Sequence, residues 1–360
     1  MDVRPVKLLH VLGGLNLKGG AEAVVRQWMA EAIPGVEQRL WMHHEFTGED
    51  DRTVSAGIAR SVNRSILWDA LNGVIEGVTL IRWLRCQEHG FVLQAHSRVG
   101  QIAAVMAGFW LLCPVVLHMH VLPGQTWIYR FLAWISNARF LFNSAKTCRH
   151  FGGSPERSMI VQPDIEWPKR CKEKGRGRTR FVAASAFVPG KNLVELVKAL
   201  RPVRSEGLDV ELHLVGLRND PANAYEREVI QNCAALEHVT LHEWNSDWYA
   251  ELKSDDIFVH LGQPESFGIV MLEAFARGCR LVVLRETFLD EFPHGERFAG
   301  IERAASIVPD RVAAAMIRAA RTAHDPKLMA RRSALRARFG LKGRLNEISN
   351  WILEIPQCTQ

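Results

Sequence analysis

Two glutamates, Glu265 and Glu273, stand eight residues apart in a stretch whose pattern predicts a strand, a loop, a helix and a second strand. The apolar run 257–259 lies upstream and the run 281–284 lies downstream, and Gly278 is typical of the residue that follows a helix. This alternation indicates a parallel α/β sheet. One carboxylate is therefore expected in the loop after a strand, and the other about two turns into the helix.

The helix between the two glutamates limits what they can bind. Free amides at a helix start attract anions, most often phosphate, whereas a carboxylate accepts hydrogen bonds from neutral hydroxyls. Eight helical residues span about 12 Å. The pair therefore suits one extended ligand with two hydroxyl-bearing groups and a phosphate between them, as in a nucleotide sugar. From the spacing alone, a capping carboxylate followed by an unrelated helical glutamate is the alternative.

Two glycine-containing turns could approach phosphate. The first strand, 7–12, runs into a glycine-rich stretch, 13–20, before a helix. This stretch is neither a Walker loop nor GxGxxG, which argues against a P-loop or an ordinary dinucleotide site. Lys191 follows Gly190 and precedes a helix through 193–200, where its ammonium would suit phosphate oxygens. A plain turn and a solvent-exposed lysine are the respective alternatives.

Three histidines follow predicted strands. The strand 91–97 contains His96 near its end, and His118 and His120 lie at the end of the strand 115–119 and just after it. Ligands collect at the carboxyl ends of strands in open α/β sheets. His118 and His120 lie on one face of their strand, but a metal site needs at least one more ligand, which the sequence does not place. A structural role is the alternative for each histidine.

The stretch from Pro264 to Gly278 resembles the paired-glutamate motif of retaining glycosyltransferases with the GT-B fold, in particular glycosyltransferase family 4. The resemblance implies that Glu265 contacts the donor sugar and that Glu273 contacts the ribose. It implies that the backbone between them serves the diphosphate and the sugar, at Ser266, Phe267, Gly268 and Ile269.

The same resemblance extends to the rest of the chain. It implies that Gly14 and Lys191 approach the donor phosphates, that Asn245 lies in the loop that meets the nucleobase, and that Glu265, His96 and Lys191 are the catalytic residues. The residues it implies on the acceptor side are Gly19, Gly20, Glu22 and His120. Ala186 stands where the family has an arginine that binds the diphosphate, so another cation substitutes or activity is low.

The family implies the function. We expect a retaining, metal-independent hexosyltransferase that needs no cofactor. It would move a sugar from a nucleotide-diphosphate sugar, with UDP-sugar favoured, to a glycan or glycolipid acceptor in cell-envelope polysaccharide or lipopolysaccharide synthesis. The alternatives are a non-catalytic sugar-nucleotide-binding subunit, suggested by Ala186, and a GT-B sugar-nucleotide epimerase.

Composition sets the broader limits. The net charge is +6, and no nucleic-acid-binding motif accompanies it, so no nucleic-acid partner is expected. Seven scattered cysteines without CxxC favour a reducing compartment. We expect a cytoplasmic protein, with peripheral contact at the anionic inner face of the cell membrane as a further option. The aromatic helical face 127–135 suits either that contact or a core helix.

The pattern predicts an α/β protein of the GT-B class, with two Rossmann-like domains of parallel sheets facing an interdomain cleft. The predicted domains are an acceptor-side domain at 1–170, a donor-binding domain at 171–335 and a C-terminal helix at 336–360 that returns to the first domain. The basic stretch 169–180 marks the boundary. We expect a loop at 47–64, a helix with core side chains at 65–88, and a buried helix at 99–112.

Overall fold

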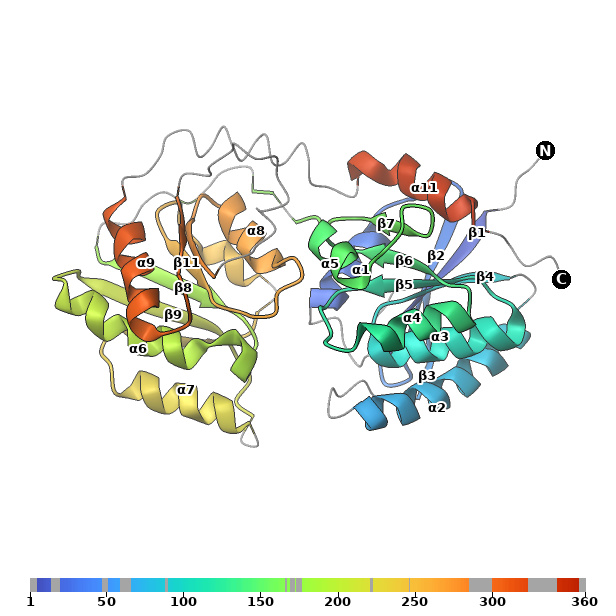
Figure 1. Cartoon of the computed structure of the whole chain (residues 1–360), viewed down its shortest axis with the longest axis horizontal. Coiled ribbons are helices and arrows are strands. Elements are labelled where there is room, and N and C mark those ends of the chain that lie inside the picture. Colours follow the sequence, from blue (N-terminus) through green and yellow to red (C-terminus); the bar gives the residue numbers. More distant parts are fainter. Residues whose placement is uncertain are drawn as a thin grey trace. The chain divides into compact units, whose positions relative to one another are not determined.

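The computed structural model describes residues 5–13, 20–46, 51–58, 66–87, 90–165, 167–168, 172, 177–220, 223–245, 247–284, 300–322 and 342–355. The chain divides into two compact units, one of Met1–Asp164 with Phe339–Gln360 and one of Ile165–Arg338 (Figure 1). The boundaries therefore lie at 164 and 338, beside the expected positions of 170 and 335.

The first unit is built on a seven-stranded parallel sheet in the order β3-β2-β1-β4-β5-β6-β7. Its strands are β1 Val6–Val11, β2 Val36–His43, β3 Thr53–Gly57, β4 Phe91–Ala95, β5 Val115–Met119, β6 Arg139–Phe142 and β7 Ser158–Ile160. Its helices are α1 Gly20–Ala30, α2 Ile66–Arg85, α3 Arg98–Leu111, α4 Thr126–Ile135, α5 Ala145–Phe151, η4 Lys342–Arg344 and α11 Leu345–Leu353.

The two faces of this sheet differ in polarity. On one face, side chains such as Leu9, Leu93 and Leu117 form an apolar core with residues of α2, α3, α4 and α5. Because successive strand residues point to opposite faces, their neighbours His10 and His118 point the other way. That second face packs against α1 and carries a buried belt of polar side chains near the carboxyl ends of the strands.

Two expectations for the first unit were wrong. The segment 47–64, expected to be a loop, contains β3, which extends the sheet beyond β2. The apolar residues of α2 were expected in the core, but many are exposed, and Leu67 is 84% exposed. Leu80 and Leu84 face the core, so α2 is buried along one side of its C-terminal half and presents apolar side chains to solvent along the other.

The second unit contains a six-stranded parallel sheet in the order β10-β9-β8-β11-β12-β13. Its strands are β8 Thr179–Ala184, β9 Val210–Leu217, β10 Val239–Glu243, β11 Ile257–His260, β12 Arg280–Val283 and β13 Ile301–Arg303. Its helices are η1 Pro189–Lys191, α6 Leu193–Ser205, α7 Ala224–Ala234, η2 Trp248–Glu251, α8 Ile269–Ala276 and α9 Pro309–Arg321.

Helices cover both faces of this second sheet. Ile257 and Val259 of β11 join the core formed with α6, α7 and α9. Phe258 points to the opposite face, where its ring lies 5.3 Å from that of Trp248 in η2. Strands that alternate with helices in two doubly covered parallel sheets confirm the predicted α/β class with two Rossmann-like domains.

Candidate functional site

Helix α8 places the two glutamates, and its ends depend on glycine. Gly268 precedes the helix with φ +85°, and a Cβ at this position would lie 2.1 Å from the Met271 side chain. At the other end Gly278 has φ +87°, and its amide donates to Phe275 while the Cys279 amide donates to Ala274. These are the hydrogen bonds of a Schellman motif, so the helix stops where Gly278 predicts.

Glu265 precedes α8, and both of its carboxylate oxygens have hydrogen-bond donors. Its Oε2 lies 3.2 Å from Lys191 Nζ and 3.0 Å from His260 Nε2. Its Oε1 accepts a hydrogen bond of 3.2 Å from the Ser266 amide. Burial alone would raise the pKa of Glu265, but the hydrogen bonds and charges of His260 and Lys191 outweigh burial and lower this pKa to about 2. Glu265 is therefore a carboxylate at neutral pH.

Glu273 lies on α8 and is connected to η2. The indole N–H of Trp248 donates to Glu273 Oε2 over 3.2 Å. Trp248 also lines a cavity of about 580 Å³ that extends over β8, β9 and β10, and Asn245 lines the same cavity. The Asn245 Oδ1 accepts from the Asp247 amide, which orders the loop after β10. The cavity wall is thus tied to the second glutamate.

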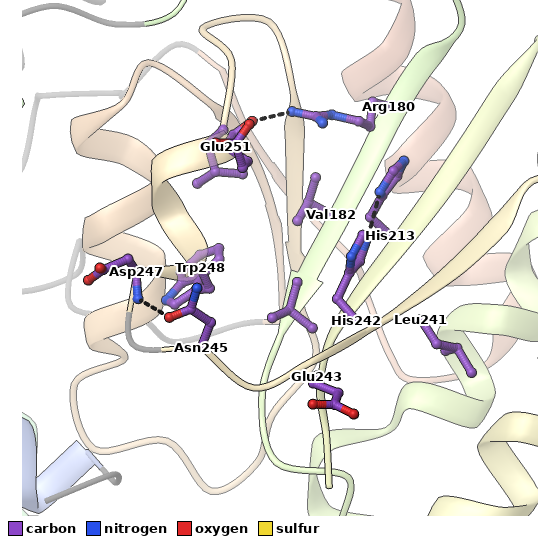
Figure 2. Close-up of a pocket in the computed structure, with 12 residues that line it drawn as sticks. Arg180, Val182, His213, Leu241, His242, Glu243, Asn245, Asp247, Trp248 and Glu251 are labelled. Carbon is purple, nitrogen blue, oxygen red and sulfur yellow. Dashed lines mark hydrogen bonds between the residues drawn. The ribbon is translucent and has the colours of Figure 1, made fainter. Parts of the chain in front are cut away.

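The cavity combines an apolar floor with polar sides (Figure 2). Val182 lies at its centre, with Trp248 and Asn245 on one side and the paired rings of His213 and His242 on the other. These two rings are stacked, with 2.9 Å between His213 Nδ1 and His242 Nε2. An apolar surface with amide, indole and imidazole groups around it suits a flat ring with polar edges.

A chain of buried polar side chains crosses the polar face of the first sheet. Its first member, Gln38, donates its amide N–H groups to the backbone oxygens of Trp28 and Glu31 at 3.0 and 2.7 Å. Carbonyl oxygens only accept, so Gln38 Oε1 faces His10 and accepts from His10 Nε2 at 2.9 Å. His10 Nδ1 is then the acceptor for His96 Nε2 at 3.0 Å.

The same reasoning fixes the remaining tautomers. His96 Nδ1 accepts from His120 Nε2 at 3.0 Å, and His120 Nδ1 accepts from the Asn143 amide group at 2.9 Å. Asn143 Oδ1 accepts from His118 Nε2 at 2.7 Å, and His118 Nδ1 accepts from Gln94 at 3.1 Å. If all four imidazoles are neutral, each carries its proton on Nε2.

Burial keeps these imidazoles neutral. It lowers the pKa of His10 to about 4, against the hydrogen bond to Gln38, which raises it. Burial also lowers the pKa of His120 to about 3, and it lowers the pKa values of His96 and His118 well below 6.5, with the neighbouring histidines adding to the shift. Both ring nitrogens of each histidine are engaged within the chain.

His96 supplies the third imidazole that a metal site at His118 and His120 requires. One ligand atom from each of the three lies within 4.8 Å of the others. The rings of His118 and His120, however, lie 4.1 Å apart at 34°, nearly stacked rather than pointing toward one centre. The arrangement among the described residues is a hydrogen-bonded chain of imidazoles rather than a preformed tetrahedral site.

The predicted residues fall into separate groups. Gly14 and Gly19 lie outside the described residues, whereas Gly20 and Glu22 occupy the first turn of α1. His96 and His120 belong to the hydrogen-bonded chain of buried polar side chains in the first unit. Apart from Gly14, the predicted donor-side residues lie in the second unit, around α8 and the loop after β10: Lys191, Asn245, Glu265, Ser266, Phe267, Gly268, Ile269 and Glu273.

Among the residues of these groups that sequence reasoning missed are His10, Trp248 and His260. His260 lies two residues from Phe258, so the alternation of β11 could have placed it on the face of α8. Trp248 begins η2, and its partner Glu273 is not evident from spacing. His10 is a central-strand residue whose partners lie far along the chain.

Comparisons with known proteins agree with this architecture. Residues 168–298 match the sequence profile "Glycosyl transferases group 1". HepE from Anabaena, solved with UDP and glucose, is 16% identical with TM-score 0.69, and the match covers 97% of this chain and 99% of that chain. Sucrose-phosphate synthase from Thermosynechococcus elongatus is 13% identical with TM-score 0.73, over 97% and 98% of the two chains.

A further similar structure is WaaG, described as a glycosyltransferase involved in lipopolysaccharide biosynthesis. It is 12% identical with TM-score 0.64, over 97% of this chain and 100% of that chain. No curated protein matches the sequence. Residues 168–298 therefore carry the sequence signature of glycosyl transferases group 1, and the chain has the GT-B fold, as the paired glutamates predict.

Proposed function

We propose that the protein is a retaining glycosyltransferase that takes its sugar from a nucleotide-diphosphate sugar, with UDP-sugar favoured. The observation that carries the proposal is the ionised Glu265 beside Lys191 at the start of α8, with Glu273 on the same helix. The HepE structures, solved with UDP, glucose and UDP-glucose, support the choice of donor.

The donor would occupy the α8 side of the second unit. Its nucleobase would lie against the apolar cavity at Asn245 and Trp248, and its ribose hydroxyls would donate to Glu273. Its diphosphate would meet Lys191 and the backbone amides at the start of α8. The sugar hydroxyls would donate to Glu265, which burial and its partners keep ionised.

These groups would assist departure of the nucleoside diphosphate. As the bond from the sugar to the phosphate oxygen breaks, negative charge grows on that oxygen, and Lys191 with the helix amides would stabilise it. Glu265 would orient the sugar so that the acceptor attacks from the face that the diphosphate leaves, which preserves the anomeric configuration. In this proposal no metal ion and no cofactor takes part.

The acceptor in this proposal is a glycan or glycolipid of the cell envelope, reached at an anionic membrane surface. The apolar face of α2 and the face of α4 that carries Trp127 and Trp134 support this proposal, since the two tryptophans are 66% and 75% exposed. Interfacial tryptophan and exposed apolar area are typical of membrane contact. None of the described helices combines the length and hydropathy needed to cross a bilayer.

The charges on these helices support an anionic lipid surface. Helix α2 contains two carboxylates, Asp69 and Glu76, and both are fully buried. The sequences of α3 and α4 contain none. Arg82, Arg85 and Arg130 are exposed on α2 and α4. The exposed arginines of this surface would attract anionic headgroups. These three helices expose no carboxylate that would repel a lipid phosphate.

The donor assignment is tested by thermal shift with UDP-, GDP-, ADP-, CMP- and dTDP-sugars. A ligand that binds the folded state raises the melting temperature. We expect one nucleotide family, the UDP-sugars, to stabilise the parent and to lose this effect in Glu273→Ala. Glu228→Ala, on the exposed surface of α7, is the matched control and should retain it. Stabilisation that persists in Glu273→Ala would remove Glu273 from the site.

A further inference from the structure

We propose that His260 is a positioning residue, which keeps Glu265 in place when Lys191 turns from Glu265 to the diphosphate of the donor. This inference rests on the proposed function and adds a residue that the paired-glutamate motif does not contain. Its basis is that one oxygen, Glu265 Oε2, receives both donors, at 3.2 Å from Lys191 and 3.0 Å from His260.

The two donors differ in how freely they can leave. His260 ends β11, and its side chain is 6% exposed, so the strand and the packing around it fix the ring. Lys191 ends η1, and its side chain is 28% exposed and has several rotatable bonds. Its ammonium can therefore move toward a phosphate while the His260 ring stays.

Close packing holds the three side chains together. A Cβ added to Gly262 would lie 2.8 Å from His260 Nε2 and 3.0 Å from Lys191 Cδ. Only glycine leaves the space in which both donors reach the same carboxylate oxygen. The group is thus built by three neighbouring segments of the second unit, the end of β11, the loop that follows it and η1.

Binding of the donor would set Lys191 between two anions. A diphosphate carries about two negative charges and would draw the ammonium away from Glu265. The Ser266 amide donates to the other oxygen, Oε1, so Oε2 of this carboxylate, which is 18% exposed, needs a donor of its own once Lys191 leaves, because an unpaired charge in a mostly buried site is unfavourable. The His260 N–H supplies that donor, so Glu265 stays ionised and oriented toward the sugar.

Ala186 increases the need for His260 to hold Glu265 while Lys191 binds the diphosphate. It stands where the resemblance implies a second cation for the diphosphate, so more of that task falls on Lys191. If Lys191 is committed to phosphate, it cannot also hold Glu265. His260 resolves the conflict by giving Glu265 a partner that does not compete for the donor.

The test compares UDP with UDP-glucose, because only the second has a sugar for Glu265 to hold. Affinities of both for the full chain are measured by isothermal titration in the parent, His260→Leu and His260→Gln. We expect UDP affinity to stay within about twofold in both variants. Affinity for UDP-glucose should fall about tenfold in the Leu variant and recover in the Gln variant, whose amide can donate to Glu265.

A cycle with Glu265→Gln separates positioning from general packing. In the Glu265→Gln variant, the further change His260→Leu should alter UDP-glucose affinity by less than about twofold, because the carboxylate that His260 holds is absent. The same tenfold loss there, or an equal loss for UDP and UDP-glucose, would overturn the inference. His260→Met replaces the Leu variant if the latter does not fold.

The failure of the inference differs from the failure of the proposed function. If the parent binds UDP and UDP-glucose and the Leu variant matches it, the role of His260 is wrong and the donor site stands. If the parent binds no nucleotide or nucleotide sugar, the proposed function is wrong, and the role of His260 is wrong with it.

Discussion

Trp248 donates its indole N–H to Glu273, with 3.2 Å between Nε1 and Oε2. The bond joins η2, which borders the cavity, to α8, which carries Glu273 and follows Glu265. It holds a carboxylate that the proposed function assigns to the ribose. The position of Trp248 in the cavity wall, which would receive the base, is therefore coupled to that of Glu273, which would receive the ribose.

Removing this bond should weaken nucleotide binding. In Trp248→Phe the ring keeps most of its packing, but Glu273 loses a donor, so its orientation is less fixed. We expect the affinity for UDP to fall about fivefold to tenfold, in line with a hydrogen bond to a charged group. Isothermal titration with UDP measures the effect. Trp134→Phe, at an exposed position of the first unit, is the control, and an equal loss in both variants would contradict the role of Trp248.

The tautomers of the buried histidines can be observed directly. We expect ¹⁵N NMR to show His10, His96, His118 and His120 as neutral rings protonated on Nε2 at pH 7, because the chain that begins at Gln38 leaves each Nδ1 as an acceptor. In Gln38→Glu the carboxylate should favour protonated His10. A ring protonated on Nδ1 in the parent would contradict the hydrogen-bond directions.

Acid should destabilise the first unit well before it protonates Glu265. The pKa of His10 is lowered in the folded state, so between pH 6.5 and about 4 the unfolded chain takes up a proton that the folded chain does not. Stability from this group is complete above pH 6.5 and falls as pH falls. At pH 5 the loss is about 2 kcal/mol for His10 alone.

Urea unfolding at pH 7.5 and pH 5 measures this loss, followed by a signal from the first unit. His10→Gln should reduce the difference between the two pH values by about 2 kcal/mol. The control is His150→Gln, because His150 is exposed on α5. If His10→Gln and the parent lose equal stability on acidification, His10 is not held neutral by burial.

The exposed aromatic face of α4 should bind anionic lipid. Cosedimentation with phosphatidylglycerol vesicles should retain the parent at low salt, and phosphatidylcholine vesicles should retain much less. A triple variant, Trp127→Ser, Phe131→Ser and Trp134→Ser, should lose about tenfold or more in vesicle affinity, because three exposed apolar side chains are removed. Ile307→Ser, an exposed apolar site in the second unit, is the control. Equal retention of the triple variant would exclude this face as the lipid contact.

The sequence predicted most elements because their signals are local. The apolar runs 115–119 and 257–259 fall within β5 and β11, as expected, and Ser144 caps α5 through a hydrogen bond from the Thr147 amide. Gly278 ends α8 through its left-handed backbone. These features depend on residues within one turn or one strand, so spacing and residue type suffice to find them.

The features that were not predicted from the sequence depend mainly on contacts between residues that are far apart along the chain. His10 and His96 are 86 positions apart, and only the order of strands β1 and β4 brings them together. The exposure of α2 was not evident from the sequence, because apolar residues occupy both its exposed and its buried sides, a pattern that is typical of a fully buried helix. β3 was missed because its strand, Thr53 to Gly57, is short and lies in a polar segment.

Cleavage of the donor tests the proposed glycosyltransferase activity most directly. ¹H NMR would follow UDP-glucose and the other nucleotide-diphosphate sugars that stabilise the protein, in the parent and in Glu265→Gln. We expect slow release of the nucleoside diphosphate by the parent, with the first sugar formed in the configuration of the donor. Release should be at least about 100-fold less in Glu265→Gln. A parent that binds the donor but never releases nucleotide, or a Glu265→Gln variant as active as the parent, would contradict the proposed activity.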